Sequence, residues 1–109
     1  MPNNDYIMVL STCNSSQVAS SLAEELVNNK LAACVNIVDK VESVYQWQGK
    51  ITRDKEFLLI IKTQKLLFSQ VEHTIQKVHD YELPEIIAVP IEAGEKNYLN
   101  WIQSSTLDC

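Results

Sequence analysis

Apolar positions in the first third of the chain form a short continuous run and then a periodic segment. The run YIMVL (6–10) contains no polar residue, which predicts a strand buried on both faces. After the polar break STCNSS, apolar side chains recur at helical spacing over 18–27. This pattern predicts an amphipathic helix of about 13 to 15 residues. Asn14 or Ser15 is suited to cap its start, and the asparagines at 28–29 are suited to a left-handed conformation at its end.

The middle of the chain predicts a long β-hairpin. The segments AACVNIV (32–38) and SVYQWQ (43–48) are rich in β-branched and aromatic residues, and the charged DKVE lies between them. One long, bent or bulged strand explains this arrangement. Gly49 then supplies the positive φ that a tight hairpin turn requires. The returning strand is clearest at EFLLIIKT (56–63), whose unbroken apolar centre predicts a central strand covered on both faces.

The last third predicts a helix, a strand and a further helix. Helical spacing of apolar residues continues over 66–79, and Pro84 prevents the helix from extending further. The run EIIAVPI (85–91) is the fourth predicted strand. Pro90 has no N–H to donate, so the end of this strand belongs at a sheet edge or a bulge. The segment GEKNYLNWIQSS (94–105) predicts a short C-terminal helix.

These elements follow the order β-α-β-β-α-β, with one extra C-terminal helix. The order predicts an α+β, ferredoxin-like sandwich in which two helices cover one face of an antiparallel sheet. A length of 109 residues suits a single domain spanning 1–109. The central strand is apolar toward both faces, so the face without helices is predicted to be a partner surface. We therefore expect a homo-oligomer.

Composition narrows the classes of function. The net charge is −5 and only nine basic residues are present, which argues against nucleic acid and against an RNA-binding domain of the same element order. The longest apolar run, FLLII, is far shorter than the roughly 20 residues of a membrane span, so no membrane partner is expected. Three widely spaced cysteines favour reduced thiols over a disulfide framework. These features together predict a soluble, cytoplasmic protein.

The cysteines and histidines are the candidate metal ligands. Cys13 follows the first predicted strand near a helix N-terminus, a position that favours the thiolate form and so a soft metal ion. A small buried residue at a turn is the equally weighted alternative. Cys34 lies within a strand, where packing is the better interpretation, and Cys109 ends the chain. His73 and His79 are six positions apart, about 120° around a helix, so they are poorly placed to clamp one ion together.

Five segments together resemble the CutA divalent-cation tolerance family. They are KLAACVNI (30–37), SVYQWQGKI (43–51), EFLLIIKT (56–63), HDYELPEI (79–86) and YLNWI (98–102). The resemblance implies a ferredoxin-like subunit in a tight homotrimer, with long hairpin strands pairing between subunits. It also implies a role in tolerance to divalent metals, including copper, and no catalytic reaction.

The resemblance further implies a cleft at the subunit boundary. His79 matches the histidine of the family's His-x-Tyr-Glu block, and Asp80 stands where proline is usual. Polar positions of the implied cleft are matched by Glu56, Lys62, Tyr81 and Glu85. By their chemistry alone, Glu56 and Lys62 would equally form an exposed cross-strand ion pair.

The sequence thus supports two functional hypotheses. The leading one is a non-enzymatic homotrimer in divalent metal tolerance, which binds copper-like ions weakly through Cys13 and His79 with donors from more than one subunit. It requires no cofactor. The alternative is a small enzyme, or a trimer that senses a small molecule, using the inter-subunit cleft. In that case Lys62, Tyr81 and Glu85 would bind a polar or anionic ligand, and Glu56 would act as acid or base.

Overall fold

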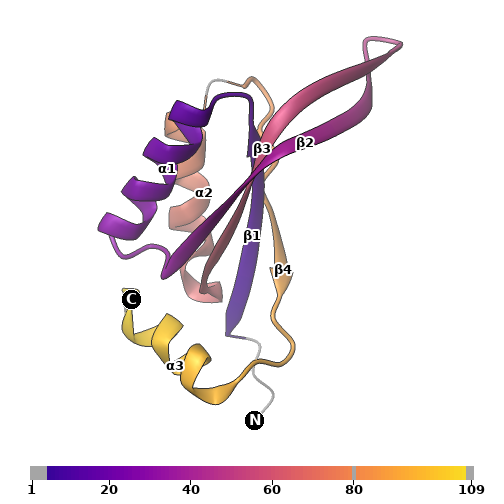
Figure 1. Cartoon of the computed structure of the whole chain (residues 1–109). Coiled ribbons are helices and arrows are strands. Elements are labelled where there is room, and N and C mark those ends of the chain that lie inside the picture. The colour runs from indigo at the N-terminus through magenta and orange to yellow at the C-terminus, as the bar shows by residue number, and fades with distance from the viewer. Residues whose placement is uncertain (1–4, 80, 108–109) are drawn as a thin grey trace.

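The structure is a computed structural model that describes residues 5–79 and 81–107. It contains a four-stranded antiparallel sheet and three α-helices (Figure 1). The strands, in spatial order, are β2 (Cys34–Trp47), β3 (Lys50–Gln64), β1 (Tyr6–Cys13) and β4 (Ile87–Pro90). The helices are α1 (Ser16–Asn28), α2 (Phe68–Val78), which a short 3₁₀ helix at Lys65–Leu67 precedes, and α3 (Lys96–Ser104). The predicted α+β, ferredoxin-like order with an extra C-terminal helix is confirmed.

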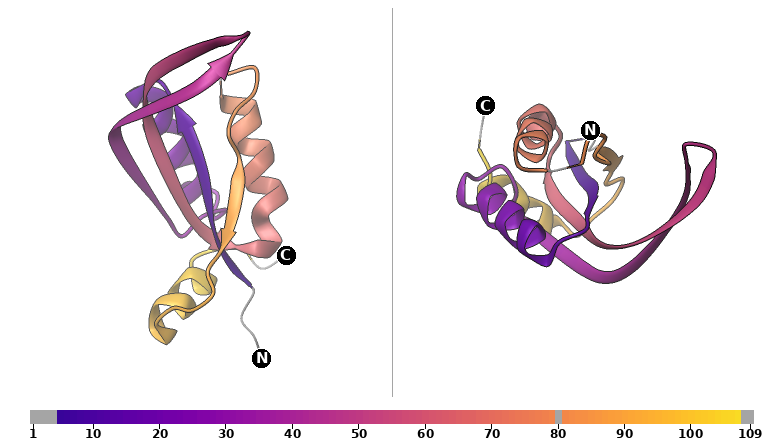
Figure 2. Two further views of the ribbon diagram at one scale, coloured as in Figure 1. Left: turned by 90° about the vertical axis from the view of Figure 1, so that its right-hand side faces the viewer. Right: turned by 90° about the horizontal axis from the view of Figure 1, so that it is seen from above.

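Helices α1 and α2 lie side by side on one face of the sheet (Figures 1 and 2). Alternate side chains of the two central strands point toward them, as the period of two along a strand requires. This layer is the main core, and its fully buried side chains include Val9, Leu22, Leu59, Ile61 and Val71. Within the described ranges, none of the helices has the length and apolar character that crossing a bilayer requires.

The end of α1 shows why one local expectation was wrong. Ser15 caps the start as expected, because its hydroxyl accepts the Val18 N–H at 3.2 Å. At the other end, however, Lys30 rather than an asparagine has the left-handed conformation, with φ of 57°. Its N–H donates to the Val27 carbonyl, and the Leu31 N–H donates to the Leu26 carbonyl. This is the Schellman arrangement, in which the left-handed residue follows the C-cap. Helix α1 continues through Asn28 and its C-cap is Asn29, so the left-handed residue is Lys30.

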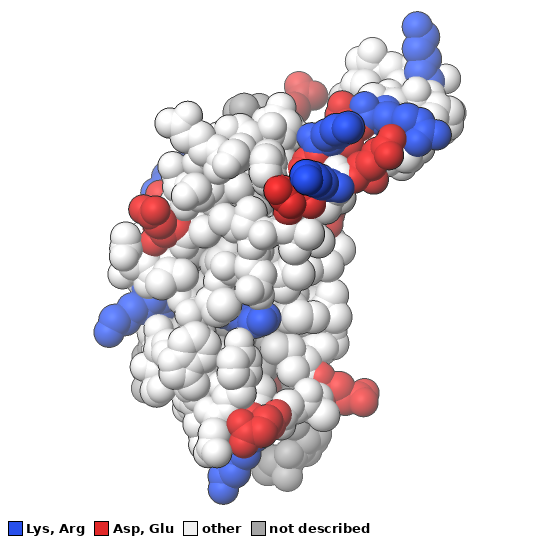
Figure 3. All heavy atoms as spheres, in the orientation of Figure 1, with Lys and Arg blue, Asp and Glu red and all other residues white. Residues whose placement is uncertain are grey.

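Strands β2 and β3 form a long hairpin that projects from the body of the molecule. A register shift between Val38 and Val41 confirms the predicted bulge, and Lys40 within it has a φ of 62°. At the tip, Gln48 and Gly49 have φ values of 51° and 79°, the conformation of a two-residue type I′ turn. Figure 2 shows the hairpin arching away from the helices. In Figure 3, charged side chains of both signs gather over this projecting part.

The second face of the sheet is covered only in part. Helix α3 covers one end, where Tyr6 is buried with Leu99 and Ile102. On β3, Leu58 and Ile60 point to this face and are half-buried. Within the single chain β3 is therefore fully covered on one face only, and covering of the second face by a partner stays a prediction. The reason is that α3 is short, so an apolar stretch of this face has no covering layer among the described residues.

Two strand boundaries also differ from expectation. Strand β1 extends to Cys13 rather than ending at residue 10, because its pairing with β3 continues to Cys13 opposite Phe57. Strand β4 is confined to Ile87–Pro90, where it pairs with β1. As predicted, Pro90 lies at the end of an edge strand, where its missing N–H is tolerated.

Candidate functional site

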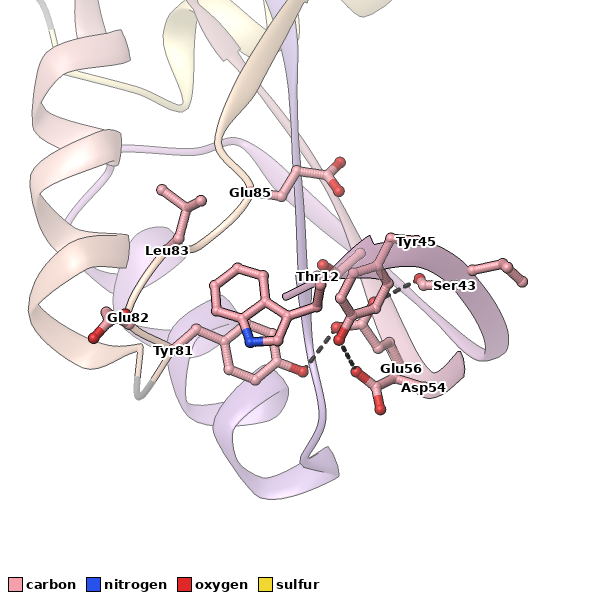
Figure 4. A pocket seen from close by; sticks show the side chains of 11 residues that line it. Thr12, Ser43, Tyr45, Asp54, Glu56, Tyr81, Glu82, Leu83 and Glu85 are labelled. Carbon is pink, nitrogen blue, oxygen red and sulfur yellow. Dashed lines mark hydrogen bonds between the residues drawn. The ribbon is translucent and has the colours of Figure 1, made fainter. Parts of the chain in front are cut away.

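A pocket of about 600 Å³ lies between the hairpin and the segment 81–85, which leads from α2 toward β4 (Figure 4). It lies where the hairpin leaves the body of the molecule. Eleven residues line it: Thr12, Ser43, Val44, Tyr45, Trp47, Asp54, Glu56, Tyr81, Glu82, Leu83 and Glu85. Its volume is in the range typical of sites for small ligands. Residues far apart in sequence therefore meet in one concave surface.

The hairpin turn explains how the polar and aromatic residues of this pocket come together. Counting outward from the turn at 48–49, the register places Tyr45 opposite Thr52 and Ser43 opposite Asp54. Directly opposed residues point to the same face, and so do alternate residues along each strand. Ser43 and Tyr45 therefore share a face with Asp54 and Glu56. This face forms the hairpin wall of the pocket.

Glu56 is the most buried carboxylate of the pocket, with only 7% of its surface exposed. One carboxylate oxygen accepts the Ser43 hydroxyl at 2.5 Å, and the other accepts the Tyr81 hydroxyl at 2.7 Å. Buried polar groups of this kind need hydrogen-bond partners, because desolvation without them is costly. Glu56 thus ties β2 to the segment after α2 and fixes the position of the Tyr81 ring.

The two pocket tyrosines are both bound to carboxylates. Tyr45 donates to Asp54, and Figure 4 shows both tyrosine hydroxyls directed at the acidic pair of the hairpin. Burial raises the pKa of Tyr81 far above its ordinary value, and the hydrogen bond to Glu56 adds to the rise. The hydrogen bond to Asp54 likewise raises the pKa of Tyr45. Both effects favour the neutral phenol, which is the form that donates.

We expect Tyr81 to ionise late in an alkaline titration. Because its pKa is higher in the folded than in the unfolded chain, its contribution to the free energy of unfolding is complete below pH ~10 and is lost above it. Phenolate absorbance should therefore show that not all four tyrosines ionise near pH ~10, and Tyr81→Phe should remove a late step. Tyr98→Phe, on the exposed side of α3, is the matched control. Because the pKa of Tyr45 is raised as well, the late step in Tyr81→Phe should become smaller, and a late step of unchanged size would contradict the assignment.

His79 holds the pocket segment to the sheet. The ring is 8% exposed, Nε2 donates to the Thr12 carbonyl at 2.6 Å, and Nδ1 accepts the Tyr81 N–H at 3.1 Å. This pair of bonds fits a neutral imidazole with the proton on Nε2. The ring also contacts the Tyr81 ring, with centroids 4.5 Å apart. A metal ion at either nitrogen would have to displace one of these hydrogen bonds.

Cys13 lies close to His79 but inside the core. Its thiol is fully buried and donates to the Ser15 carbonyl at 3.5 Å. The preceding residue, Thr12, accepts the bond from His79, so the fold brings the two predicted metal ligands near each other. Over 5–79 and 81–107, no three His, Cys, Asp or Glu side chains are grouped to hold a metal ion. The metal site at Cys13 and His79 stays a prediction.

Three of the four predicted cleft residues meet in the pocket. Glu56, Tyr81 and Glu85 line it, whereas Lys62 lies further along β3 with its Nζ 5.8 Å from the centre of the Tyr98 ring. The alternative of an exposed Glu56–Lys62 ion pair is wrong, because Glu56 is buried and bound by two hydroxyls.

The other residues singled out from the sequence have simpler outcomes. His73 is exposed on α2, and Cys34 is half-buried on β2. Asp80 and Cys109 lie outside the described residues.

Sequence reasoning missed the hairpin wall of the pocket. Ser43, Tyr45 and Trp47 were assigned to a strand without a functional role, and Asp54 was given no role. The signal was present in the turn, because a two-residue loop at 48–49 fixes the cross-strand pairs by counting. Counting cross-strand pairs does not predict that the segment 81–85 forms the opposite side of the pocket. Only the path of the chain after α2 brings that segment to the hairpin.

Comparisons with known proteins agree on one family. Residues 7–105 match the family described as CutA1 divalent ion tolerance protein. The divalent-cation tolerance protein CutA of Thermus thermophilus is 42% identical over 91% of this chain and 96% of its own length. The chloroplastic protein CutA of Arabidopsis thaliana is 45% identical over 92% of this chain, which spans about half (55%) of that longer relative. The crystal structure of CutA1 from Oryza sativa superposes with a TM-score of 0.94 at 42% identity, covering 96% of each chain.

Proposed function

The chain belongs to the CutA family of divalent ion tolerance proteins, and we propose that it acts as a homotrimer in the response to divalent metal ions without catalysing a reaction. The observation that carries the role is the family match over almost the whole described chain. The family and its Thermus thermophilus member are named for tolerance to divalent ions and not for a reaction. We place the protein in the cytoplasm, where its thiols stay reduced.

The uncovered face of the sheet supports the assembly. Met8, Leu10, Leu58 and Ile60 point to this face from the two central strands, and each is only half-buried. Beside them, Ile87 of β4 is 51% exposed. Burying such a face against other copies would remove apolar surface from water, at roughly 25 cal/mol for each Å². The edge strands β2 and β4 also offer free backbone groups for pairing between copies.

We propose that the trimer binds copper-like ions weakly through Cys13 and His79. A thiolate and an imidazole are a donor pair that suits Cu(I), Cu(II) or Zn(II) better than Mg or Ca. The closeness of both residues to Thr12 supports this proposal. A third or fourth donor would come from another subunit. No resident cofactor is required.

Titration of Cu(I) into the full chain, under anaerobic conditions and against a chromophoric chelator, tests the metal site. We expect Cys13→Ser and His79→Gln each to weaken binding by about tenfold or more, because each removes a donor. His73→Gln changes an exposed histidine of α2 in the same way and is expected to leave the affinity unchanged. Equal affinity in the wild type and in both ligand variants would remove Cys13 and His79 from the site.

A second proposal is that the trimer senses a small molecule through the pocket. The observation that favours it is the pocket of about 600 Å³, in which Glu56, Tyr81 and Glu85 meet. A ligand that binds the native state raises the melting temperature, so a thermal-shift screen across neutral, anionic and cationic small molecules tests it. A screen without any shift, in a protein that still binds copper, would reject this proposal and leave the metal proposal standing.

A further inference from the structure

The lining of the pocket is acidic. Four of its eleven residues are carboxylates, namely Asp54, Glu56, Glu82 and Glu85, and none of the eleven is Lys, Arg or His. Among the described residues, the two ion pairs are Arg53–Glu42 and Lys77–Glu25, and neither includes a pocket carboxylate. Clefts that carry charges of one sign concentrate ligands of the opposite sign. In the single chain, the charge of the pocket therefore favours a positively charged ligand.

Glu56 has free capacity to bind such a ligand. An ionised carboxylate has about four acceptor sites, and the Ser43 and Tyr81 hydroxyls use two of them. Both donors are neutral, so the negative charge of Glu56 is solvated but not balanced by them. Because the group is 7% exposed, attraction to a cation in the pocket is screened less than it would be in water. An ammonium group supplies both the charge and up to three N–H donors.

Aromatic rings form part of the pocket wall around these acids. Tyr45, Trp47 and Tyr81 all line it. Tyr45 and Tyr81 are held by hydrogen bonds to Asp54 and Glu56, so their rings do not have to be ordered when a ligand enters. Aromatic faces attract ammonium groups and also pack against the methylene groups that carry them. This combination favours an organic cation with an aliphatic body.

The acids of the pocket come from two separate segments, which favours a ligand with two positive charges. Figure 4 shows Asp54 and Glu56 together on the hairpin side, whereas Glu82 and Glu85 lie apart from that pair on the segment after α2. A flexible chain with an ammonium at each end offers one charge to each side of the pocket, and a volume of about 600 Å³ has room for it.

We infer that the pocket binds an aliphatic diamine or polyamine, with one ammonium group at Glu56 and Asp54 and a second near Glu82 or Glu85. The methylene chain lies against Tyr45, Trp47 and Tyr81. This inference rests on the proposal that the pocket binds a small molecule and is independent of the copper proposal. It reverses the charge expected from sequence, where Lys62 was placed in the cleft and an anionic or polar ligand was expected.

Isothermal titration of the full chain with diaminobutane and spermidine tests the inference. Butanediol has the same carbon chain without charge, and succinate has the opposite charge, so both serve as ligand controls. We expect the two amines to bind with a dissociation constant below about 1 mM and neither control to bind. Glu56→Gln keeps the size and the acceptor oxygen for Tyr81 but removes the charge, and it should weaken amine binding by about tenfold or more. Glu24→Gln, an exposed residue of α1, makes the same charge change outside the pocket and should leave binding within about twofold.

Each other result overturns the inference. Amines that fail to bind the wild type at millimolar concentration, or that bind Glu56→Gln equally well, would reject it. If Glu56→Gln does not fold, the half-buried Asp54→Asn gives the same comparison. Binding of succinate or butanediol alone would reject the diamine and keep the small-molecule proposal. If the thermal-shift screen also finds no ligand of any charge, both proposals fail together.

Discussion

Replacing Ile60 by aspartate should convert the proposed trimer into monomers. Ile60 lies on central strand β3, on the sheet face that α1 and α2 do not cover, and it is half-buried in the single chain. In a monomer the new carboxylate stays in contact with water and costs little. In a trimer built on this face it is taken out of water, at an effective cost of several kcal/mol for each ion, repeated in every subunit.

Native mass spectrometry at micromolar concentration measures this effect directly. The wild type should appear at three times the mass of the chain, and Ile60→Asp at the mass of one chain. Val27→Asp is the matched control, because Val27 is a 42% exposed apolar residue of α1, on the opposite side of the sheet. That variant should remain trimeric. A wild-type monomer would reject the assembly itself, and a trimeric Ile60→Asp would reject this face as the interface.

The second large effect is expected from His79→Ala. The substitution leaves the Thr12 carbonyl and the Tyr81 N–H without the partners they have now, and an unsatisfied buried group costs about 1 to 3 kcal/mol. It also removes a ring that is 8% exposed and packs against Tyr81. We expect the free energy of unfolding to fall by about 2 to 4 kcal/mol, with water entering the space and recovering part of the cost.

Urea denaturation of the full chain measures this loss, with the midpoint compared at an unchanged slope. His73→Ala removes the exposed histidine of α2 and should change stability by no more than about 0.5 kcal/mol. Equal midpoints for His79→Ala and His73→Ala would show that the bonds of His79 do not stabilise the fold. The outcome matters for function, because His79 also positions Tyr81 at the pocket.

The order of the helices and strands could be predicted because each of them is marked by a pattern within its own segment of the sequence. Apolar spacing distinguishes the helix at 16–28 from the strands, and Pro84 separates α2 from β4. The hairpin followed from Gly49 and the β-branched segments around it. The predictions of secondary structure failed only at the ends of helices and strands, where contacts with residues distant in sequence determine the boundary. Strand β1 continues to Cys13 because β3 pairs with it there, and no local signal marks that residue.

The candidate site could likewise be predicted only in part. The resemblance to the CutA family pointed to Glu56, Tyr81 and Glu85, which meet in the pocket. It also pointed to Lys62, which lies apart from the pocket in the single chain. The residues of the hairpin wall could have been found by counting cross-strand pairs outward from the turn. The hydrogen bonds of His79 could not be predicted in this way, since its partners are the carbonyl of Thr12 and the N–H of Tyr81. One of these partners is a distant strand residue and the other depends on the turn after α2.

The sequence by itself therefore determined the α+β order, the long hairpin and an apolar sheet face that two helices leave open. It did so because hydrophobic period, glycine and proline act over a few neighbouring residues. The tertiary structure alone decided that the segment 81–85 meets the hairpin and that Glu56 is buried between two hydroxyls. It also decided that the pocket is lined by acids and aromatic rings. The contact of Tyr81 with Glu56 joins residues 25 positions apart, and only packing of the whole chain brings them together.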